Sequence, residues 1–188
     1  MFKGRFSVAF LASFLFFAGS TALGVWVVMQ DPAVGEALVE AVGRELFSRL
    51  MDDAAWVVAV KLFLNNLQAC ILLFAGGATF GVLTLAVLGV NGLLIGGVLE
   101  LVRQQQGLLY VTLAIVPHGI FEVPAFLTAA ALGLLLGEHL MNELLGHGDA
   151  AAGASGLART FAGIVIPFLA VAAIIEAFIT PQILNLLV

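Results

Sequence analysis

Residues 6–29, FSVAFLASFLFFAGSTALGVWVVM, decide the class of fold, because this run contains no charged side chain. About 20 predominantly apolar residues in a helix cross the hydrocarbon core of a bilayer. The run does not alternate between apolar and polar positions, so it favours a helix over a barrel strand. It is also longer than the apolar part of a cleaved signal peptide. We therefore expect a retained first transmembrane helix.

The whole chain has the composition of a membrane protein. Of its 188 residues, 62% are apolar and 10% are charged, whereas soluble domains have about 45–50% apolar and about 25% charged residues. The mean hydropathy is +1.16. The formal net charge is −5 and no basic run occurs, which argues against nucleic acid as a partner. We expect one integral membrane domain over residues 1–188, surrounded by the lipid bilayer.

A second apolar region, residues 56–101, is long enough for two helices. Gly76 and Gly77 near its middle supply its strongest turn signal. The region therefore predicts a helical hairpin with spans over 56–75 and 78–101.

The segment between the first and second spans, residues 32–53, has the pattern of an amphipathic helix. Asp31 suits the N-cap position and Pro32 suits the first turn. Apolar residues recur at spacings of three and four, and most charged residues fall elsewhere on the helical wheel. We expect this helix to lie on the membrane surface without crossing it.

The remaining apolar sequence predicts two further spans. Residues 108–137 are more than one straight span requires, and Pro117, Gly119 and Pro124 predict that this helix is broken or kinked. After a glycine-rich loop, the last span is expected over 160–181. The predicted fold class is therefore an all-α polytopic membrane helix bundle of about five transmembrane helices, or six if the fourth crosses as two halves.

Polar side chains within these spans are the candidate functional residues, because a charge at the centre of a span costs about 2.5–3.5 kcal/mol. If the sequence after Pro117 is helical, His118 and Glu122 share one helix face and can pair. Glu176 stands alone in the last span and needs a partner on another helix. The candidate partners are Lys61, His118 and the side-chain amides of Asn65 and Asn66. The intramembrane polar set is Asn65, Asn66, Gln68, Asn91, His118, Glu122 and Glu176.

Each of these polar groups has two interpretations. The amides can hydrogen-bond neighbouring helices, or they can line a hydrated cavity. His118 and Glu122 can form a structural ion pair that holds a kink, or they can form a proton or ion site. Distances decide between the two: if Glu122 and Glu176 approach the same water-filled space, a shared site is favoured, whereas carboxylates sealed against hydrogen-bond donors favour a structural role.

Other patterns indicate close packing and no chemistry. Three small-xxx-small pairs let helix backbones approach each other, namely Gly77 and Gly81, Gly92 and Gly96, and Gly133 and Gly137.

The sequence contains no HExxH, GxxxxGK[ST], GxSxG or CxxC pattern. The spacing of His139, Glu143 and His147 is a weak metal signal, because Gly146 interrupts the helix. We therefore expect no enzymatic activity, no bound metal and no cofactor.

A group of motifs extends from the second predicted span to the last. The motifs are Phe63–Asn66, Phe74–Gly77 with Gly81, Asn91-Gly92 with Gly96, Pro117–Ala125, Gly133, Gly137 and Ala172–Pro181. The most specific is Pro-His-Gly-x-x-Glu at residues 117–122. Together these motifs resemble the stage II sporulation protein M family. The resemblance implies an integral protein of the cell membrane with five or six spans and no catalytic activity of its own. In spore-forming bacteria, the namesake belongs to a membrane complex with peptidoglycan-remodelling enzymes.

Two functions follow as hypotheses. The first is a non-catalytic membrane scaffold, in a homo-oligomer or with membrane-protein partners, as in a cell-envelope or sporulation complex. The alternative is a small proton- or cation-conducting transporter or channel whose path uses the intramembrane His, Glu and Asn residues.

Overall fold

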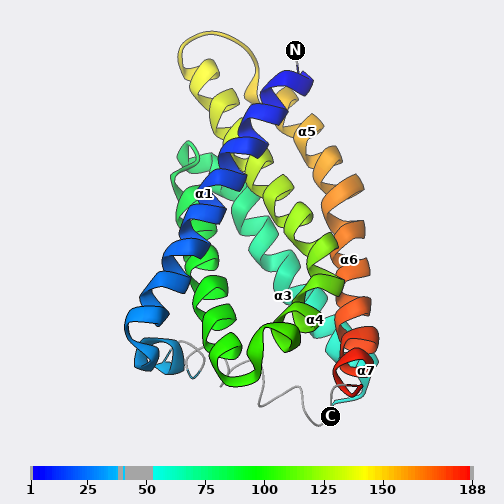
Figure 1. The fold of residues 1–188 in the computed structure, drawn as a ribbon. Helices are drawn as coiled ribbons and strands as arrows, with labels where there is room; N and C mark the ends of the chain where they lie inside the picture. Colours follow the sequence, from blue (N-terminus) through cyan, green and yellow to red (C-terminus); the bar gives the residue numbers. More distant parts are fainter. Residues whose placement is uncertain (1, 38–39, 41–52, 187–188) are drawn as a thin grey trace.

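The computed structural model describes residues 2–37, 40 and 53–186, which are almost entirely helical (Figure 1). No strand occurs among these residues. The long helices are α1 (Phe2–Gln30), α3 (Ala55–Ala75) and α4 (Val82–Leu144). A C-terminal series follows, namely α5 (Ala150–Thr160), η2 (Phe161–Val165), α6 (Ile166–Ile174), η3 (Ile175–Ile179) and α7 (Thr180–Leu184).

Four helical stretches are long and apolar enough to cross a membrane. They are Gly4–Gln30, Ala55–Thr79, Val82–Leu144 and Ala150–Leu184. Large apolar side chains are exposed in the middle of each, as expected for helices that contact lipid; examples are Leu15, Ile71, Val90, Ile120 and Ile174. The prediction of an all-α membrane helix bundle is confirmed.

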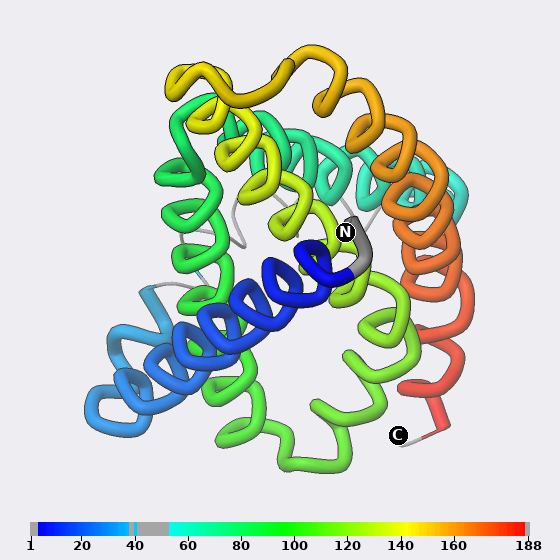
Figure 2. Tube along the Cα trace, turned by 90° about the horizontal axis from the view of Figure 1, so that it is seen from above, coloured from blue at the N-terminus to red at the C-terminus, as the bar shows by residue number. Residues whose placement is uncertain are grey.

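Gly107 divides α4 into two arms. Its backbone (φ 85°, ψ 168°) is the one non-helical position inside α4, in a region that essentially only glycine adopts. The first arm, residues 82–106, runs beside α1, and the second, residues 108–144, crosses the molecule and then ascends between α1 and the C-terminal helices (Figures 1 and 2). With α4 counted as two arms, the described chain has five long apolar helical segments.

The second arm keeps helical dihedral angles at Pro117, Gly119 and Pro124, so the predicted break of the helix is not observed there. The predicted alternative, a kink, agrees with the change of direction between the crossing and the ascending parts of this arm (Figure 1). Proline fits helical φ and costs mainly one backbone hydrogen bond, which transmembrane helices tolerate where neighbouring groups compensate. The chain reverses direction at Gly107 instead, where no side chain opposes the left-handed φ.

The connection between α3 and α4 is longer than the sequence predicts. Residues 76–79 form the 3-10 helix η1 (Gly76–Thr79), and Phe80 and Gly81 have φ of 56° and 85°, so the next helix begins at Val82 and not at residue 78. The buried hydroxyl of Thr84 donates a 2.8 Å hydrogen bond to the Leu73 carbonyl across this turn. It satisfies one of the carbonyls that a helix end leaves unpaired.

Glycine lets α1 pack backbone to backbone against the first arm of α4. A Cβ on Gly96 would overlap the carbonyl oxygen of Thr21, and a Cβ on Gly24 would overlap that of Leu93. A Cβ on Gly92 would lie 2.7 Å from the Cβ of Ser20. Helices in lipid associate through close packing of this kind.

The last helix begins earlier than predicted. Asp149 is its N-cap and accepts a 3.0 Å hydrogen bond from the Ala152 amide, while Glu143 accepts one of 2.9 Å from the Ala150 amide. The expected glycine-rich loop over 138–159 is therefore wrong, since only residues 145–149 separate α4 from α5. Asp149 and Glu143 supply acceptors for the first amides of α5, which makes this start favourable.

Only the start of the predicted amphipathic helix is described. Residues 32–37 are helical, and the Ala33 amide donates a 3.0 Å hydrogen bond to Asp31 Oδ1. This contact is the N-cap interaction expected for Asp31. The remainder of 32–53, apart from residues 40 and 53, lies outside the described residues.

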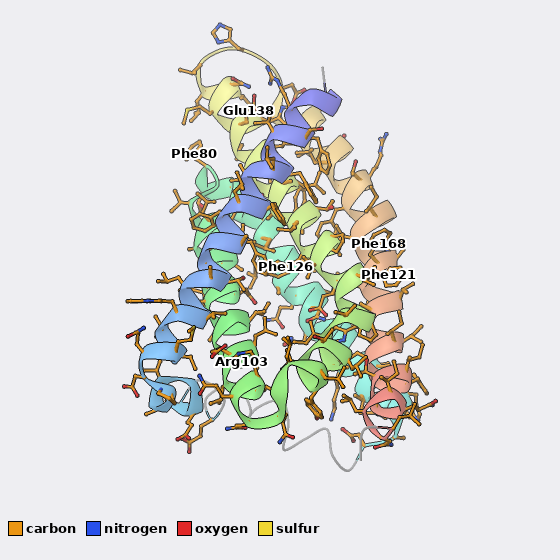
Figure 3. All side chains as sticks on the ribbon, viewed as in Figure 1. Phe80, Arg103, Phe121, Phe126, Glu138 and Phe168 are labelled. Atoms are coloured by element: carbon orange, nitrogen blue, oxygen red, sulfur yellow. The ribbon has the colours of Figure 1, made fainter. Side chains whose placement is uncertain are left out.

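Charged pairs mark the two ends of the bundle (Figure 3). At one end, Arg5 pairs with Glu138 at 2.6 Å. At the other, Arg103 forms two 2.7 Å hydrogen bonds with Glu100. The candidate ionisable groups of the sequence lie between these ends, in the apolar part of the bundle.

Candidate functional site

Three predicted side chains converge inside the bundle. They are His118, Glu122 and Glu176. Each offers one nitrogen or oxygen atom that could bind a metal ion, and these three atoms lie within 4.8 Å of one another. His118 Nε2 is 3.9 Å from Glu122 Oε2. The group joins the second arm of α4 to η3, and Glu176 follows Glu122 by more than 50 residues.

Local structure explains how the three meet. The uninterrupted helix after Pro117 places His118 and Glu122 one turn apart on one face. Glu176 comes from the π-helical turn η3, which precedes Pro181. Phe121, beside Glu122, meets Phe168 of α6 edge to face with ring centroids 6.0 Å apart, which holds the two helices in this register (Figure 3).

The site is half-buried. The His118 and Glu122 side chains are 14% and 26% exposed, and His118 Nδ1 is buried without a hydrogen-bond partner in the part of the chain that the structure describes. Among the described residues, no lysine or arginine lines the two adjoining cavities. Within residues 2–37, 40 and 53–186, the two carboxylates therefore share this site without a positive side chain in the cavity walls.

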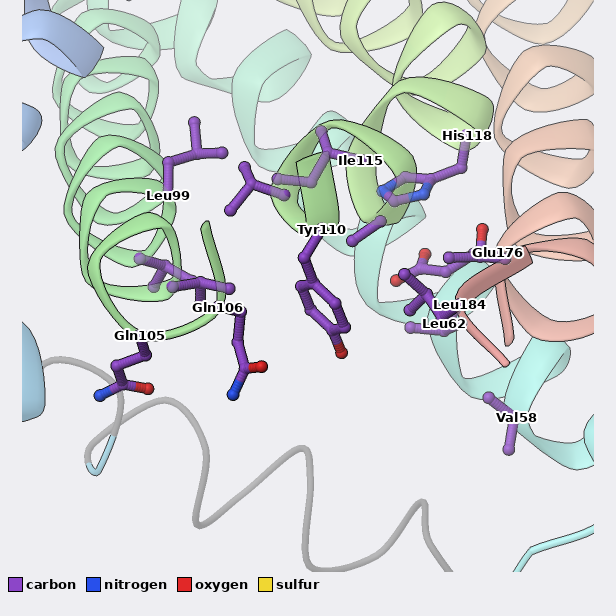
Figure 4. Close-up of a pocket in the computed structure, with 15 residues that line it drawn as sticks. Val58, Leu62, Leu99, Gln105, Gln106, Tyr110, Ile115, His118, Glu176 and Leu184 are labelled. Carbon is purple, nitrogen blue, oxygen red and sulfur yellow. The ribbon is translucent and has the colours of Figure 1, made fainter. Parts of the chain in front are cut away.

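A cavity of about 610 Å³ leads to the site from one end of the bundle. His118 and Glu176 lie at its inner part, and Tyr110 projects into it (Figure 4). Gln105 and Gln106, beside the Gly107 turn, line its outer part. This region is wide enough for water, which groups of this polarity can hold.

A second cavity of about 290 Å³ adjoins the first. His118 lines both, whereas Glu122 and Asn91 line only the smaller one. The Asn91 amide donates a 2.8 Å hydrogen bond to the Val87 carbonyl of its own helix. The two carboxylates thus line neighbouring cavities, and the imidazole of His118 lines both.

The opposite side of the site is closed by the apolar core. Ala125, Leu127 and Ala129 on the next turns of α4 are at most 3% exposed. Phe126 packs against Phe17 of α1 with ring centroids 5.9 Å apart (Figure 3). In the described part of the chain, the site is therefore reached from the Gly107 end and sealed toward the end that carries the Arg5–Glu138 pair.

The amides predicted on α3 do not join this site. Asn65 and Gln68 are exposed, and Asn65 donates a 3.4 Å hydrogen bond to the half-buried Asn66. None of the three lines either cavity. Lys61, on the same helix, forms an ion pair with Asp53.

Sequence reasoning missed Tyr110 and Thr180, which line the larger cavity. In a helix, each would lie on the same face as a predicted site residue, since Thr180 follows Glu176 by four positions and Tyr110 precedes His118 by eight. That spacing is a signal that could have found them. Gln105 and Gln106 lie beyond the span predicted over 78–101, but the helix continues through them to the edge of the cavity.

Comparison with known proteins assigns the chain to a family. The sequence profile of the stage II sporulation protein M family matches residues 13–181. An uncharacterized protein of Methanocaldococcus jannaschii is 31% identical over 126 residues, which cover 65% of this chain and 71% of that protein. No solved structure matches the chain. Because the family profile spans all the helices that build the site, the chain belongs to the stage II sporulation protein M family.

Proposed function

We propose that this membrane protein binds a cation or proton at His118, Glu122 and Glu176 and conducts it across the bilayer. The observation that carries the proposal is the convergence of three ionisable side chains from two helices on two adjoining cavities, which no lysine or arginine lines in the part of the chain that the structure describes. Ionisable residues inside membrane bundles typically mark ion or proton pathways.

Hydrogen bonding favours this role over a purely structural one. Within the described chain, neither Glu122 nor Glu176 accepts a hydrogen bond of ordinary length, and the His118–Glu122 separation of 3.9 Å is longer than such a bond. A structural polar network in lipid is stabilising only when its members are satisfied. A bound proton or cation would satisfy these carboxylates.

The site also lies at a useful depth. Leu184, the last residue of α7, follows Glu176 by eight residues, which corresponds to about 12 Å along a helix at about 1.5 Å per residue. Transporter sites are typically found near the middle of the bilayer, beside irregular helical turns. The π-helical turn η3 around Glu176 is such an irregularity.

Flux measurements test the proposal. We would reconstitute the protein in vesicles that contain a pH-sensitive or cation-sensitive dye, and measure flux after an imposed gradient. Glu122→Gln and Glu176→Gln should each abolish the flux. Glu138→Gln is a matched control on the same helix, because Glu138 pairs with Arg5 at the bundle end. Absence of flux for every ion tested with the unmodified protein would refute the proposal.

A scaffold role remains a second candidate, because α3 presents exposed amides at membrane depth. Asn65 and Gln68 lie near the middle of the 21-residue helix α3, one turn apart on its surface. An amide that faces lipid is costly unless it hydrogen-bonds, and interhelical amide pairs drive association in membranes. Asn65 and Gln68 therefore favour the binding of a partner helix, which comes from a second copy of this chain or from another protein of a cell-envelope complex.

Association in mild detergent tests the scaffold role. Asn65→Leu combined with Gln68→Leu should convert an oligomer or complex to the monomer and leave ion flux unchanged. Ile71→Leu, a substitution on the same exposed face of α3, is the matched apolar control. A monomer for the unmodified protein, with no captured partner, would exclude the scaffold role.

A further inference from the structure

We infer that the ion bound at His118, Glu122 and Glu176 is a divalent first-row transition-metal ion, held exchangeably by one imidazole nitrogen and two carboxylate oxygens. The inference rests on the proposed function for the location of the site and adds the class of ion. It also revises the expectation from sequence that the chain binds no metal.

The donor set selects the class of ion. Mg²⁺ and Ca²⁺ are hard cations that take oxygen ligands, whereas imidazole suits zinc, copper, iron and nickel. A site built for Na⁺, Ca²⁺ or Mg²⁺ would have no use for His118 between the two carboxylates. One imidazole with two carboxylates and open positions is an arrangement that first-row transition metals accept.

The charge of the site gives the same answer. With both glutamates ionised, the site carries two negative charges, and no lysine or arginine among the residues that the structure describes lines the adjoining cavities. A divalent cation neutralises this pair in one binding event, whereas a monovalent cation leaves one charge in the apolar part of the bundle. Uncompensated charge is costly there.

Geometry permits the coordination with small movements. Zinc binds nitrogen and oxygen at about 2.0–2.2 Å, which puts two tetrahedral ligand atoms about 3.4 Å apart. The three ligand atoms now lie within 4.8 Å of one another, so side-chain rotation that brings them closer by at most about 1.4 Å is sufficient. Water in the larger cavity can occupy the remaining coordination position on the side of Tyr110 and Thr180.

The surroundings of His118 indicate an exchangeable ion and not a structural one. Tightly held metal ligands have a hydrogen-bond partner on the second imidazole nitrogen, and its loss typically weakens binding by about 10–100-fold. His118 Nδ1 has no such partner among the described residues. Reversible binding of this kind is required of a conducted ion.

Metal binding can be measured without any transport assay. The purified protein in detergent is titrated with Co²⁺, whose visible absorption reports the coordinating atoms, and with Zn²⁺ in competition. We expect one Co²⁺ per chain, displaced by Zn²⁺ and retained in a thousandfold excess of Mg²⁺. Glu176→Gln and His118→Ala should each weaken binding at least tenfold.

The controls separate this site from others and from misfolding. His147→Ala removes an exposed histidine near the end of α4 and should leave Co²⁺ binding unchanged. His118→Asp keeps an oxygen donor, so it should retain metal binding while losing the preference for Co²⁺ over Mg²⁺. If Co²⁺ binding is lost in His147→Ala and retained in His118→Ala, the inference is overturned in favour of the His139–His147 end of the helix.

Failure of this inference is distinguishable from failure of the proposed function. Proton flux that depends on Glu122, together with no Co²⁺ binding, would overturn the metal and leave a proton site. Co²⁺ binding that depends on His118, with no flux of any ion, would support the metal site and refute conduction.

Discussion

Replacing Gly96 by alanine tests the packing of α1 on the first arm of α4. The new Cβ would overlap the carbonyl oxygen of Thr21, which belongs to the backbone of α1 and cannot rotate away. Overpacking of this kind costs about 1–3 kcal/mol, while alanine gains about 0.8–1.0 kcal/mol of helix propensity over glycine. The net expectation lies between no change and about 2 kcal/mol of destabilisation.

Gly19→Ala is the matched control, because Gly19 lies in α1 and a Cβ there meets nothing within 4 Å. It receives the same gain in helix propensity without the overlap, so it should stabilise the protein by up to about 1 kcal/mol. The difference between the two variants isolates the steric cost and should be about 1–3 kcal/mol. That difference corresponds to about a tenfold to hundredfold change in the unfolding equilibrium.

Unfolding in mixed detergent micelles, followed by circular dichroism, measures both variants under the same conditions. Gly24→Ala should behave like Gly96→Ala, since its Cβ would overlap the carbonyl oxygen of Leu93 on the other side of the same interface. Equal stabilisation by Gly96→Ala and Gly19→Ala would refute this packing of α1. It would also remove the support for the cavity wall that the same arm supplies through Val98 and Leu99.

Three further substitutions test other parts of the fold. Thr84→Val removes the 2.8 Å hydrogen bond to the Leu73 carbonyl and should destabilise the protein by about 1–3 kcal/mol in detergent unfolding, whereas Thr84→Ser should change it little. Gly107→Ala places a Cβ where nothing lies within 4 Å, so a loss of about 1–3 kcal/mol in the same assay would come from the backbone alone; no loss would contradict the turn. In a double-mutant cycle, Phe121→Leu and Phe168→Leu should show a coupling of about 0.5–1.5 kcal/mol, and a coupling near zero would argue against the edge-to-face contact.

The sequence predicted the class of fold because lipid constrains it strongly. Long uncharged runs such as residues 6–29 have few alternatives to a transmembrane helix. The predicted helix boundaries were less accurate where capping side chains determine the first residue of a helix. Asp149 and Glu143 start the last helix ten residues before the predicted position, and composition alone cannot separate a glycine-containing helix from a loop.

Proline was a weaker guide than glycine to the path of the chain. Pro117 and Pro124 lie within a continuous helix, whereas Gly107, which sequence reasoning placed merely at the end of a hairpin, is the position where α4 reverses. A proline removes one donor from a helix that lipid otherwise enforces. Gly107 instead adopts a backbone conformation that no other residue type adopts at comparable cost.

The candidate site shows which part of a function can be derived from spacing. The pairing of His118 with Glu122 follows from i,i+4 geometry, because the sequence after Pro117 is helical. The approach of Glu176 is a tertiary contact, and burial cost predicted only that this carboxylate needs some partner. The same argument about the cost of burying a polar group applies to Asn65 and Gln68, yet both side chains are exposed on the surface of the bundle.

Burial cost therefore identifies polar groups that need an explanation without giving the direction in which they point. For Glu176 the explanation is inside the chain, beside His118 and Glu122. For Asn65 and Gln68 it lies outside, in a partner helix or in contacts beyond the described residues. The two proposals make independent demands on one bundle, because α3 carries the outward amides while α4 and η3 carry the inward acids. Variants on α3 should alter association without altering ion binding, and variants of the inner acids should do the reverse.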